Sequence, residues 1–230
     1  MSSTAPTAEG RYLVKFSFVS QTGVNLPQVV VEIDVARPGD LWPYYNNAGV
    51  SNDGAANEGD FDGDGWSYSA QRLAAAGLTP AASVTVDSLQ YTWPDAQPGE
   101  LNNIEAGGQT IPLPANSGGA SIGILGSATN AYPGSQGTFR VTYTDGTTQE
   151  VNLALSDWTL GGGASSTPFF GNTIAATTAY RDTTSGGRDN ITTYVFGASA
   201  ALTPGKAAQS ITLPASVDQG QLHVFAFSIG

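Results

Sequence analysis

The sequence contains no cysteine, which excludes a disulfide framework, a thiolate metal site and a thiol nucleophile. Its only lysines are Lys15 and Lys206, and no Walker-type glycine loop with a lysine is present, so nucleotide-driven chemistry is not expected. No apolar run approaches the roughly 18 residues that cross a bilayer. The first ten residues lack the basic and apolar regions of a signal peptide, so any export signal is expected outside this chain.

Basic residues are scarce as well. Nineteen acidic residues stand against eight Lys plus Arg, which gives a net charge of −11. Binding to a polyanion depends on clustered Lys and Arg that neutralise its charges. The composition therefore predicts no nucleic-acid partner and no anionic membrane partner.

The residues that are abundant belong to turns and sheets. The chain has 29 glycines, 13 prolines, nine tyrosines and four tryptophans, and only 12% of its residues are charged. Short strand-like runs follow one another from residue 83 to residue 229, and Asp145-Gly146 marks a hairpin turn. This pattern predicts an all-β protein built as a single antiparallel β-sandwich or jelly roll.

Two features precede these runs. Residues 11–19 and 28–35 have strand composition, and the Gly- and Pro-bearing segment between them predicts a hairpin. One short helix is expected near residues 67–77, with Ser67 or Ser69 as its N-cap and Gly77 at its C-terminal end. We accordingly divide the chain into an N-terminal arm, residues 1–38, and a β-sandwich module, residues 39–230.

Acidic residues alternate in the loop before this helix. Asp60, Asp62 and Asp64 stand in the segment Asp-Phe-Asp-Gly-Asp-Gly, and Ca²⁺ prefers six to eight oxygen ligands from such tight loops. The twelfth position from Asp60 is Gln71 and not a bidentate Glu, which argues against an EF-hand. A calcium site completed by Asp53 and Glu58 is one prediction, and a solvated Asx turn before a helix is the other.

Loop aromatics suggest a platform for sugar rings, because the apolar faces of sugars pack on aromatic rings while amides bond the hydroxyls. Trp93 and Trp158 end strand-like runs and are expected in the core. The predicted ligand-binding residues are those in the loops: Trp42, Tyr44, Tyr45, Asn46, Asn47 and Trp66.

Catalytic signals are weaker. Residues 119–123 spell G-x-S-x-G, but no helix is expected after them, as a nucleophile elbow requires. The single histidine, His223, lies on an apolar strand face with Phe225 and Phe227 and is expected to be packed. A hydrolase or lyase that uses paired carboxylates such as Asp62 and Asp157 stays open as an alternative.

A series of motifs carries a family resemblance. The segments "YYNNAGVSNDG", "FDGDGWSYSAQRLAAAGLTP", "GILGSATNA" and "QLHVFAFSIG" resemble a C-terminal accessory module of secreted actinobacterial glycoside hydrolases. The resemblance runs from about Leu41 to the C-terminus and implies a galactose-binding-like β-sandwich that is not itself catalytic. The arm resembles the last strands of a preceding immunoglobulin-like domain. In the family pattern Asp62 is present, whereas Asp64 replaces a glycine.

Together these observations predict an extracellular bacterial module that binds a glycan or polysaccharide, with a structural Ca²⁺ as its candidate cofactor. Two other functions stay open. One is the hydrolase or lyase described above. The other is a structural domain that docks on a neighbouring catalytic domain.

Overall fold

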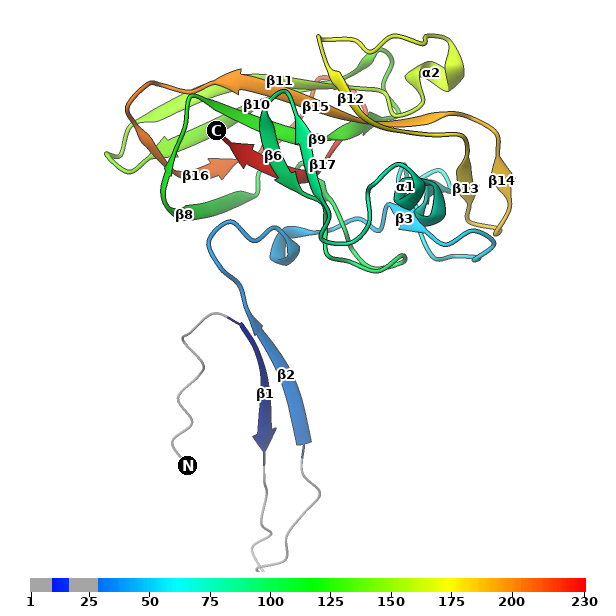
Figure 1. Ribbon diagram of the computed structural model, residues 1–230, viewed down its shortest axis with the longest axis horizontal. Helices are drawn as coiled ribbons and strands as arrows, with labels where there is room; N and C mark the ends of the chain where they lie inside the picture. The colour runs from blue at the N-terminus through cyan, green and yellow to red at the C-terminus, as the bar shows by residue number, and fades with distance from the viewer. Residues whose placement is uncertain (1–9, 17–28) are drawn as a thin grey trace, which may run out of the picture.

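The computed structural model describes residues 10–16 and 29–230. It confirms the predicted all-β sandwich, because strands form most of its regular structure and its helices are short (Figure 1). The predicted turn at Asp145-Gly146 joins two neighbouring strands, with Gly146 at a φ of 81°. Only glycine adopts that region at little cost, which explains its place there.

Two antiparallel sheets form the sandwich. The first has the order β11-β10-β16-β8, and the second has the order β12-β15-β9-β17-β7. The strands of the first sheet are β8 (Thr110–Gly118), β10 (Gly134–Tyr143), β11 (Thr148–Ser156) and β16 (Ala207–Thr212). Those of the second are β7 (Ile104–Glu105), β9 (Ser121–Thr129), β12 (Thr173–Thr178), β15 (Thr193–Ala201) and β17 (Gln221–Ile229).

The main core fills the space between these sheets. Phe139 and Val141 of β10 point inward from the first sheet, and Ile122 and Ile124 of β9 point inward from the second. Their alternation with outward residues is the period of two that a strand imposes. Full burial of one such side chain contributes about 1.5–3 kcal/mol.

The outer face of the five-stranded sheet is also covered. One cover is a small sheet of order β14-β13-β4-β3, in which β3 and β4 are parallel, and the other is the hairpin β5–β6. These strands are β3 (Val50–Ser51), β4 (Trp66–Ser69), β5 (Ser83–Val86), β6 (Leu89–Thr92), β13 (Arg181–Thr183) and β14 (Arg188–Asp189). A second core lies beneath the small sheet, where Phe61, Tyr68, Trp93, Trp158 and Phe225 are packed. The predicted core positions of Trp93 and Trp158 are confirmed.

Strand β17 takes part in both cores. Val224 faces the main core and Phe225 the second one, as the alternation requires. A β-bulge between Val224 and Ala226 then shifts the register against β9. As a result Phe227 packs against the main core, so the expectation that it shares a face with His223 is wrong.

The helices are short. Helix α1 (Ala70–Ala75) begins later than the predicted residue 67, because Ser67 and Tyr68 pair with β13 as part of β4. Ser69 is the N-cap and accepts a bond from the Arg72 N–H at 3.2 Å, while Gly77 follows the helix with a φ of 90°. A 3₁₀ turn η1 (Trp42–Tyr44) and an irregular helix α2 (Leu160–Gly163) were not predicted. Among the described residues, no helix has the length and apolar character needed to cross a membrane.

The N-terminal arm is a hairpin of β1 (Gly10–Phe16) and β2 (Val29–Val35), which projects from the sandwich (Figure 1). The strand pairing agrees with the predicted hairpin, and its turn lies outside the described residues. The chain then joins the sandwich, where the Gly39 N–H donates to the Pro112 carbonyl of β8 at 2.7 Å.

Candidate functional site

The acid loop, residues 58–66, uses its carboxylates to hold its own backbone. Asp60 Oδ1 accepts hydrogen bonds from the N–H groups of Gly63 and Gly65 at 2.9 and 3.0 Å. Asp62 Oδ1 accepts from the N–H groups of Asp64 and Trp66 at 3.0 and 3.2 Å. These are the bonds of an Asx-rich turn. The carboxylate of Asp64 is exposed.

Asp62 is buried beside a cation. Arg181 Nη1 lies 3.9 Å from Asp62 Oδ2, and the same guanidinium bonds Asp189 at 2.8 Å. Burial raises the pKa of Asp62, and the backbone donors and Arg181 oppose that rise. The guanidinium also lies 4.1 Å from the centre of the Trp66 ring. One face of Trp66 is therefore covered, which leaves less of the ring for a sugar than the sequence predicts.

The other two acids predicted for calcium point elsewhere. Asp53 accepts hydrogen bonds from Ser69, Tyr180 and Arg188. Burial raises its pKa, but these donors outweigh burial and the net shift is downward. Glu58 accepts from the backbone N–H and side-chain amide of Asn52. Within the described residues, no three His, Cys, Asp or Glu side chains form a group that could hold a metal ion.

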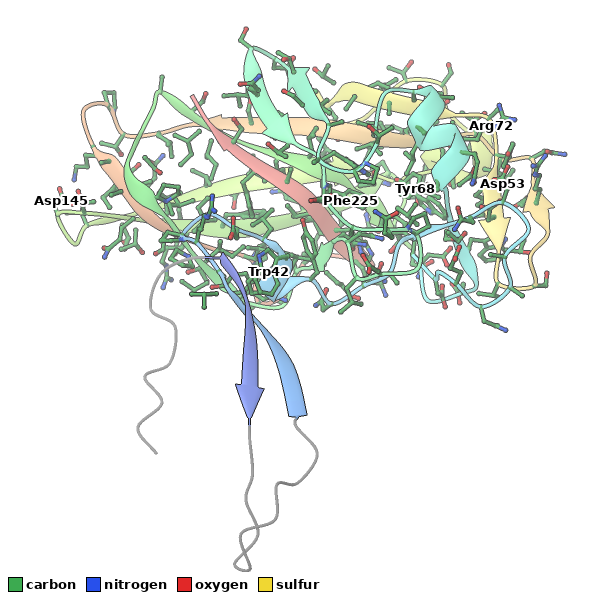
Figure 2. The ribbon with its side chains drawn as sticks, turned by 60° about the horizontal axis from the view of Figure 1, so that its bottom comes forward. Trp42, Asp53, Tyr68, Arg72, Asp145 and Phe225 are labelled. Carbon is green, nitrogen blue, oxygen red and sulfur yellow. The ribbon has the colours of Figure 1, made fainter. Side chains whose placement is uncertain are left out.

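Another carboxylate, Asp182, lies near Asp53 and Glu58, and the sequence did not predict a role for it. Asp182 of β13 is fully buried, and its Oδ2 accepts a hydrogen bond from Ser51 at 3.2 Å. Its Oδ1 has no hydrogen-bond partner among the described residues. Burial, followed by the negative charge of Asp53, raises the pKa of Asp182 to about 6. Figure 2 shows Asp53 and Arg72 at this end of the molecule, far from Asp145.

The predicted aromatic loop, residues 42–47, mostly faces the protein. Tyr44 and Tyr45 pack against the main core. Asn46 bonds both the N–H and the carbonyl of Glu105, at 2.7 and 3.1 Å, and Asn47 bonds Asp60 and Asn103. Trp42 is 47% exposed and lies near the base of the arm (Figure 2). The structure therefore leaves one large open aromatic surface in this loop, and the amides serve as braces.

The residues considered for catalysis are also engaged. Asp157 Oδ1 accepts hydrogen bonds from the N–H and hydroxyl of Thr159 and from the Gly161 N–H, at 2.6–2.9 Å. His223 lies between Asn103 and Thr129, at 2.9 and 3.1 Å, and burial lowers its pKa to about 3. Its ring packs 4.3 Å from that of Phe61, as expected for a core histidine.

A polar cleft opens at the other edge of the sandwich. It has a volume of about 330 Å³. Its walls come from β10, β11, β15, the tip of the β5–β6 hairpin and the loop before β12: Asp87, Gln136, Asn152, Leu153, Ala154, Phe170, Gly171, Asn172, Ala198 and Ser199. We call it the Phe170 cleft. Edge strands β11 and β12 lie here, whereas the aromatic loop is bonded to β7 at the opposite edge of the five-stranded sheet.

Several polar atoms of the Phe170 cleft are free to meet a ligand. The Gln136 side-chain amide and the Ser199 hydroxyl make no hydrogen bond with other described residues. Asn152 uses its Oδ1 to accept from Thr138 at 2.8 Å, and its NH₂ group bonds no other residue in the described part of the chain. Asp87 Oδ1 accepts from Thr173 at 2.9 Å, and its Oδ2 has no partner among these residues. The cleft thus offers amide, hydroxyl and carboxylate groups together.

Phe170 stands at the cleft with 46% of its surface exposed. Its φ is 56°, a left-handed conformation that is an outlier for a bulky residue. Such strain costs on the order of 1–3 kcal/mol and persists where surrounding contacts enforce it. A Cβ built on Gly134 would lie 2.8 Å from a ring carbon of Phe170, so the ring rests against a position that requires glycine.

A buried brace holds the loop that carries Phe170. Asn172 Oδ1 accepts from the Ser156 N–H at 2.7 Å and from the Ser156 hydroxyl at 2.9 Å. Asn172 Nδ2 donates to the Ala154 carbonyl at 2.9 Å, and Ser156 Oγ accepts from the Phe169 N–H at 2.9 Å. The cleft wall is therefore fixed before any ligand binds, which lowers the entropic cost of binding.

The sequence did not predict this cleft. Its residues come from five separate segments that only the sheet topology brings together. One local signal was present: two consecutive aromatics in the turn-rich segment 166–172, "STPFFGN", where Gly and Asn commonly permit positive φ.

A search of curated proteins returns no match to this chain. The family model described as an AziU2-like beta-sandwich domain matches residues 37–230, which is most of the chain. The matched region begins close to the point where Gly39 is bonded to β8 and includes both edges of the sandwich. The chain therefore belongs to the family of AziU2-like β-sandwich domains.

Proposed function

We propose that this protein is a non-catalytic accessory module of an extracellular glycan-degrading enzyme and that it binds a glycan in the Phe170 cleft. The observation that carries the proposal is an exposed aromatic ring on a braced loop, beside amide and hydroxyl groups that bond no other described residue. Sugars present apolar C–H faces and hydroxyl edges, and this cleft has a partner for each. The resemblance of the sequence to accessory modules of glycoside hydrolases supports the same proposal.

The affinity for one short sugar is expected to be modest. Gln136, Asn152, Ser199 and Asp87 are exposed and hydrated in the free protein, so binding must displace the water that covers them. The ring of Phe170 contributes stacking and the burial of apolar area. Specificity then depends on the hydroxyl pattern that the free polar atoms can satisfy.

The test is a glycan array probed with the purified chain, followed by titration of each hit with variants. Phe170→Ala is expected to lower affinity at least roughly tenfold, the equivalent of about 1.4 kcal/mol. Leu101→Ala is the matched control, because Leu101 is also an exposed apolar residue but precedes β7 at the opposite edge. Both variants should keep the parent melting temperature within a few degrees.

Three results would overturn the proposal. The first is an array without any hit above background. The second is a hit whose affinity survives Phe170→Ala but is lost in Trp42→Ala, which would move the site to the predicted aromatic loop. The third is turnover of a polysaccharide that Asp62→Asn abolishes without loss of fold, which would make the chain an enzyme.

Docking on a neighbouring catalytic domain is a second candidate function. Trp42 favours it, because this exposed indole lies in the segment that connects the projecting arm to the sandwich (Figure 2). Large exposed aromatics are frequent energetic anchors of protein interfaces. Association with a separately expressed glycoside hydrolase domain, weakened by Trp42→Ala and unaffected by Phe170→Ala, would establish this function.

A further inference from the structure

The wall of the Phe170 cleft carries a negative charge and no positive one. None of its wall residues is Lys, Arg or His, and its one ionisable side chain is Asp87. The whole chain carries a net charge of −11, so no long-range attraction for anions offsets this carboxylate. A sugar that bears a carboxylate or sulfate would bring a like charge next to Asp87 with no cation to pair it.

A second exposed aromatic stands beside the loop that carries Phe170. Tyr132 is 54% exposed, and its ring centre lies 5.5 Å from that of Phe169 in an edge-on arrangement. Gly161 lets the ring lie this way, because a Cβ there would come within 2.6 Å of it. Tyr132 therefore has a defined position and does not move freely in solvent.

Hydrogen bonds hold the backbone that follows Tyr132 at the place where it borders the Phe170 cleft. Gln219 Nε2 donates to the Gly134 carbonyl at 2.7 Å, and Asp218 Oδ1 accepts from the Gln136 N–H at 2.7 Å. Gly134 is the residue against which Phe170 rests, and Gln136 is a cleft wall residue. The two exposed rings thus belong to two adjoining, braced segments, 132–136 and 169–172.

We infer that the Phe170 cleft binds a chain of at least two uncharged sugar units, one stacked on Phe170 and the next on Tyr132. This inference rests on the proposed glycan-binding function and specifies its ligand. Asp87, Gln136, Asn152 and Ser199 bond the hydroxyls of the first unit. Tyr132 adds a stacking surface that a single sugar does not reach.

Two titration series with the whole chain test the inference. The first compares uncharged polysaccharides (galactan, mannan and dextran) with carboxylated ones (polygalacturonan, alginate and carboxymethyl-dextran). The second uses galacto-, manno- and gluco-oligosaccharides of one to six units against the parent protein, Phe170→Ala, Tyr132→Ala and the control Leu101→Ala. Melting temperatures verify that every variant is folded.

The expected result is binding to at least one uncharged polymer and at least roughly tenfold weaker binding to its carboxylated counterpart. Phe170→Ala should weaken binding at every length. Tyr132→Ala should change the affinity for a single unit less than about twofold and lower that for longer chains roughly tenfold, as loss of one stacked ring predicts. Asp87→Asn should narrow the gap between uncharged and carboxylated polymers.

The failures are distinguishable. If no polymer of either kind binds, the proposed function is overturned and the inference falls with it. If glycans bind through Phe170 but carboxylated polymers bind equally well, the function stands and the charge selection is wrong. If Tyr132→Ala leaves the affinity for every chain length unchanged, the second stacking position is wrong.

Discussion

The acid loop and the Phe170 cleft are both rich in polar side chains, but they use their polar atoms in opposite ways. In the acid loop, Asp60 and Asp62 accept hydrogen bonds from the N–H groups of their own segment. In the cleft, Gln136 and Ser199 present atoms that no other described residue bonds. The polar residues of the first region shape a backbone, and those of the second are available to a ligand. Residue type alone does not separate these roles.

Truncation of Phe61, which anchors the acid loop, should destabilise the protein more than any other change considered. Phe61 is fully buried and packs against Tyr68, Trp158 and His223. Phe61→Ala should lower the free energy of unfolding by about 3–5 kcal/mol, as truncation of a core aromatic does. Urea denaturation measures it, and Phe61→Leu should cost less. If the loop and the cleft are independent, the folded variant keeps its affinity for glycan; a loss of affinity would show that the two regions are coupled.

Asn172 should affect both stability and binding. Asn172→Ala removes three hydrogen bonds and leaves the buried Ser156 N–H unpaired, so a loss of roughly 1–3 kcal/mol is expected. The brace on Phe170 is lost with it, and glycan affinity should fall as well. Asn152→Ala provides the stability control, because this exposed residue should change stability by less than about 0.5 kcal/mol. Unchanged glycan affinity in Asn172→Ala would show that the brace does not position Phe170.

Asp182 differs from the carboxylates of the acid loop, because its Oδ1 is buried and has no partner among the described residues. Its pKa rises from 3.8 to about 6 in the folded protein. Between these values the folded state binds more protons than the unfolded state, so stability should fall as the pH rises from about 4 to above 6. Asp182→Asn should flatten this dependence and raise the melting temperature at pH 7.5. A variant with an unaltered pH profile would show that Asp182 does not titrate in this range.

Calcium at the acid loop should change the stability of the protein least. Asp64 has an exposed carboxylate, but Asp62 Oδ2 lies 3.9 Å from Arg181, so only weak binding is expected. At a concentration about five times the Kd, an ion stabilises by about 1 kcal/mol. That corresponds to a rise in melting temperature of roughly 2–4 °C for a domain of this size. Asp64→Gly should remove the shift, and an equal melting temperature in 10 mM calcium and in chelator would rule out the ion.

Local chemistry made most of the fold predictable. Alternating runs, the Asp145-Gly146 turn, the Ser69 cap and the burial of Trp93 and Trp158 each depend on short-range patterns. The start of α1 did not follow from such a pattern, because the pairing of Ser67 and Tyr68 with β13 is a contact with residues more than 100 positions away. The propensity of a short segment is overridden by such pairing.

The site was predicted less well for a related reason. Asn46 and Asn47 look like ligand-binding amides in the sequence, yet Glu105, Asp60 and Asn103 occupy them in the fold. Conversely, Gln136 and Asn152 stand in ordinary strand patterns, and only the packing of β10 and β11 beside the Phe170 loop makes them cleft residues. Whether a polar atom is free depends on its neighbours in space, and sequence spacing does not report them.

The bulge in β17 lets two consecutive side chains, Phe225 and Ala226, face the covered outer side of the five-stranded sheet. Val224, before the bulge, faces the main core. Phe227 and Ile229, after the bulge, face the same core, although they lie three and five residues from Val224 and a regular strand would place them on the opposite face. Deletion of the extra residue, Phe225, would leave Phe227 and Ile229 at even spacing from Val224 and therefore still on the main-core face, but it would remove the aromatic ring from the second core. The extra residue should therefore matter for the second core and not for the orientation of the C-terminal side chains, so deletion of Phe225 and Phe225→Ala should destabilise the protein to a similar degree.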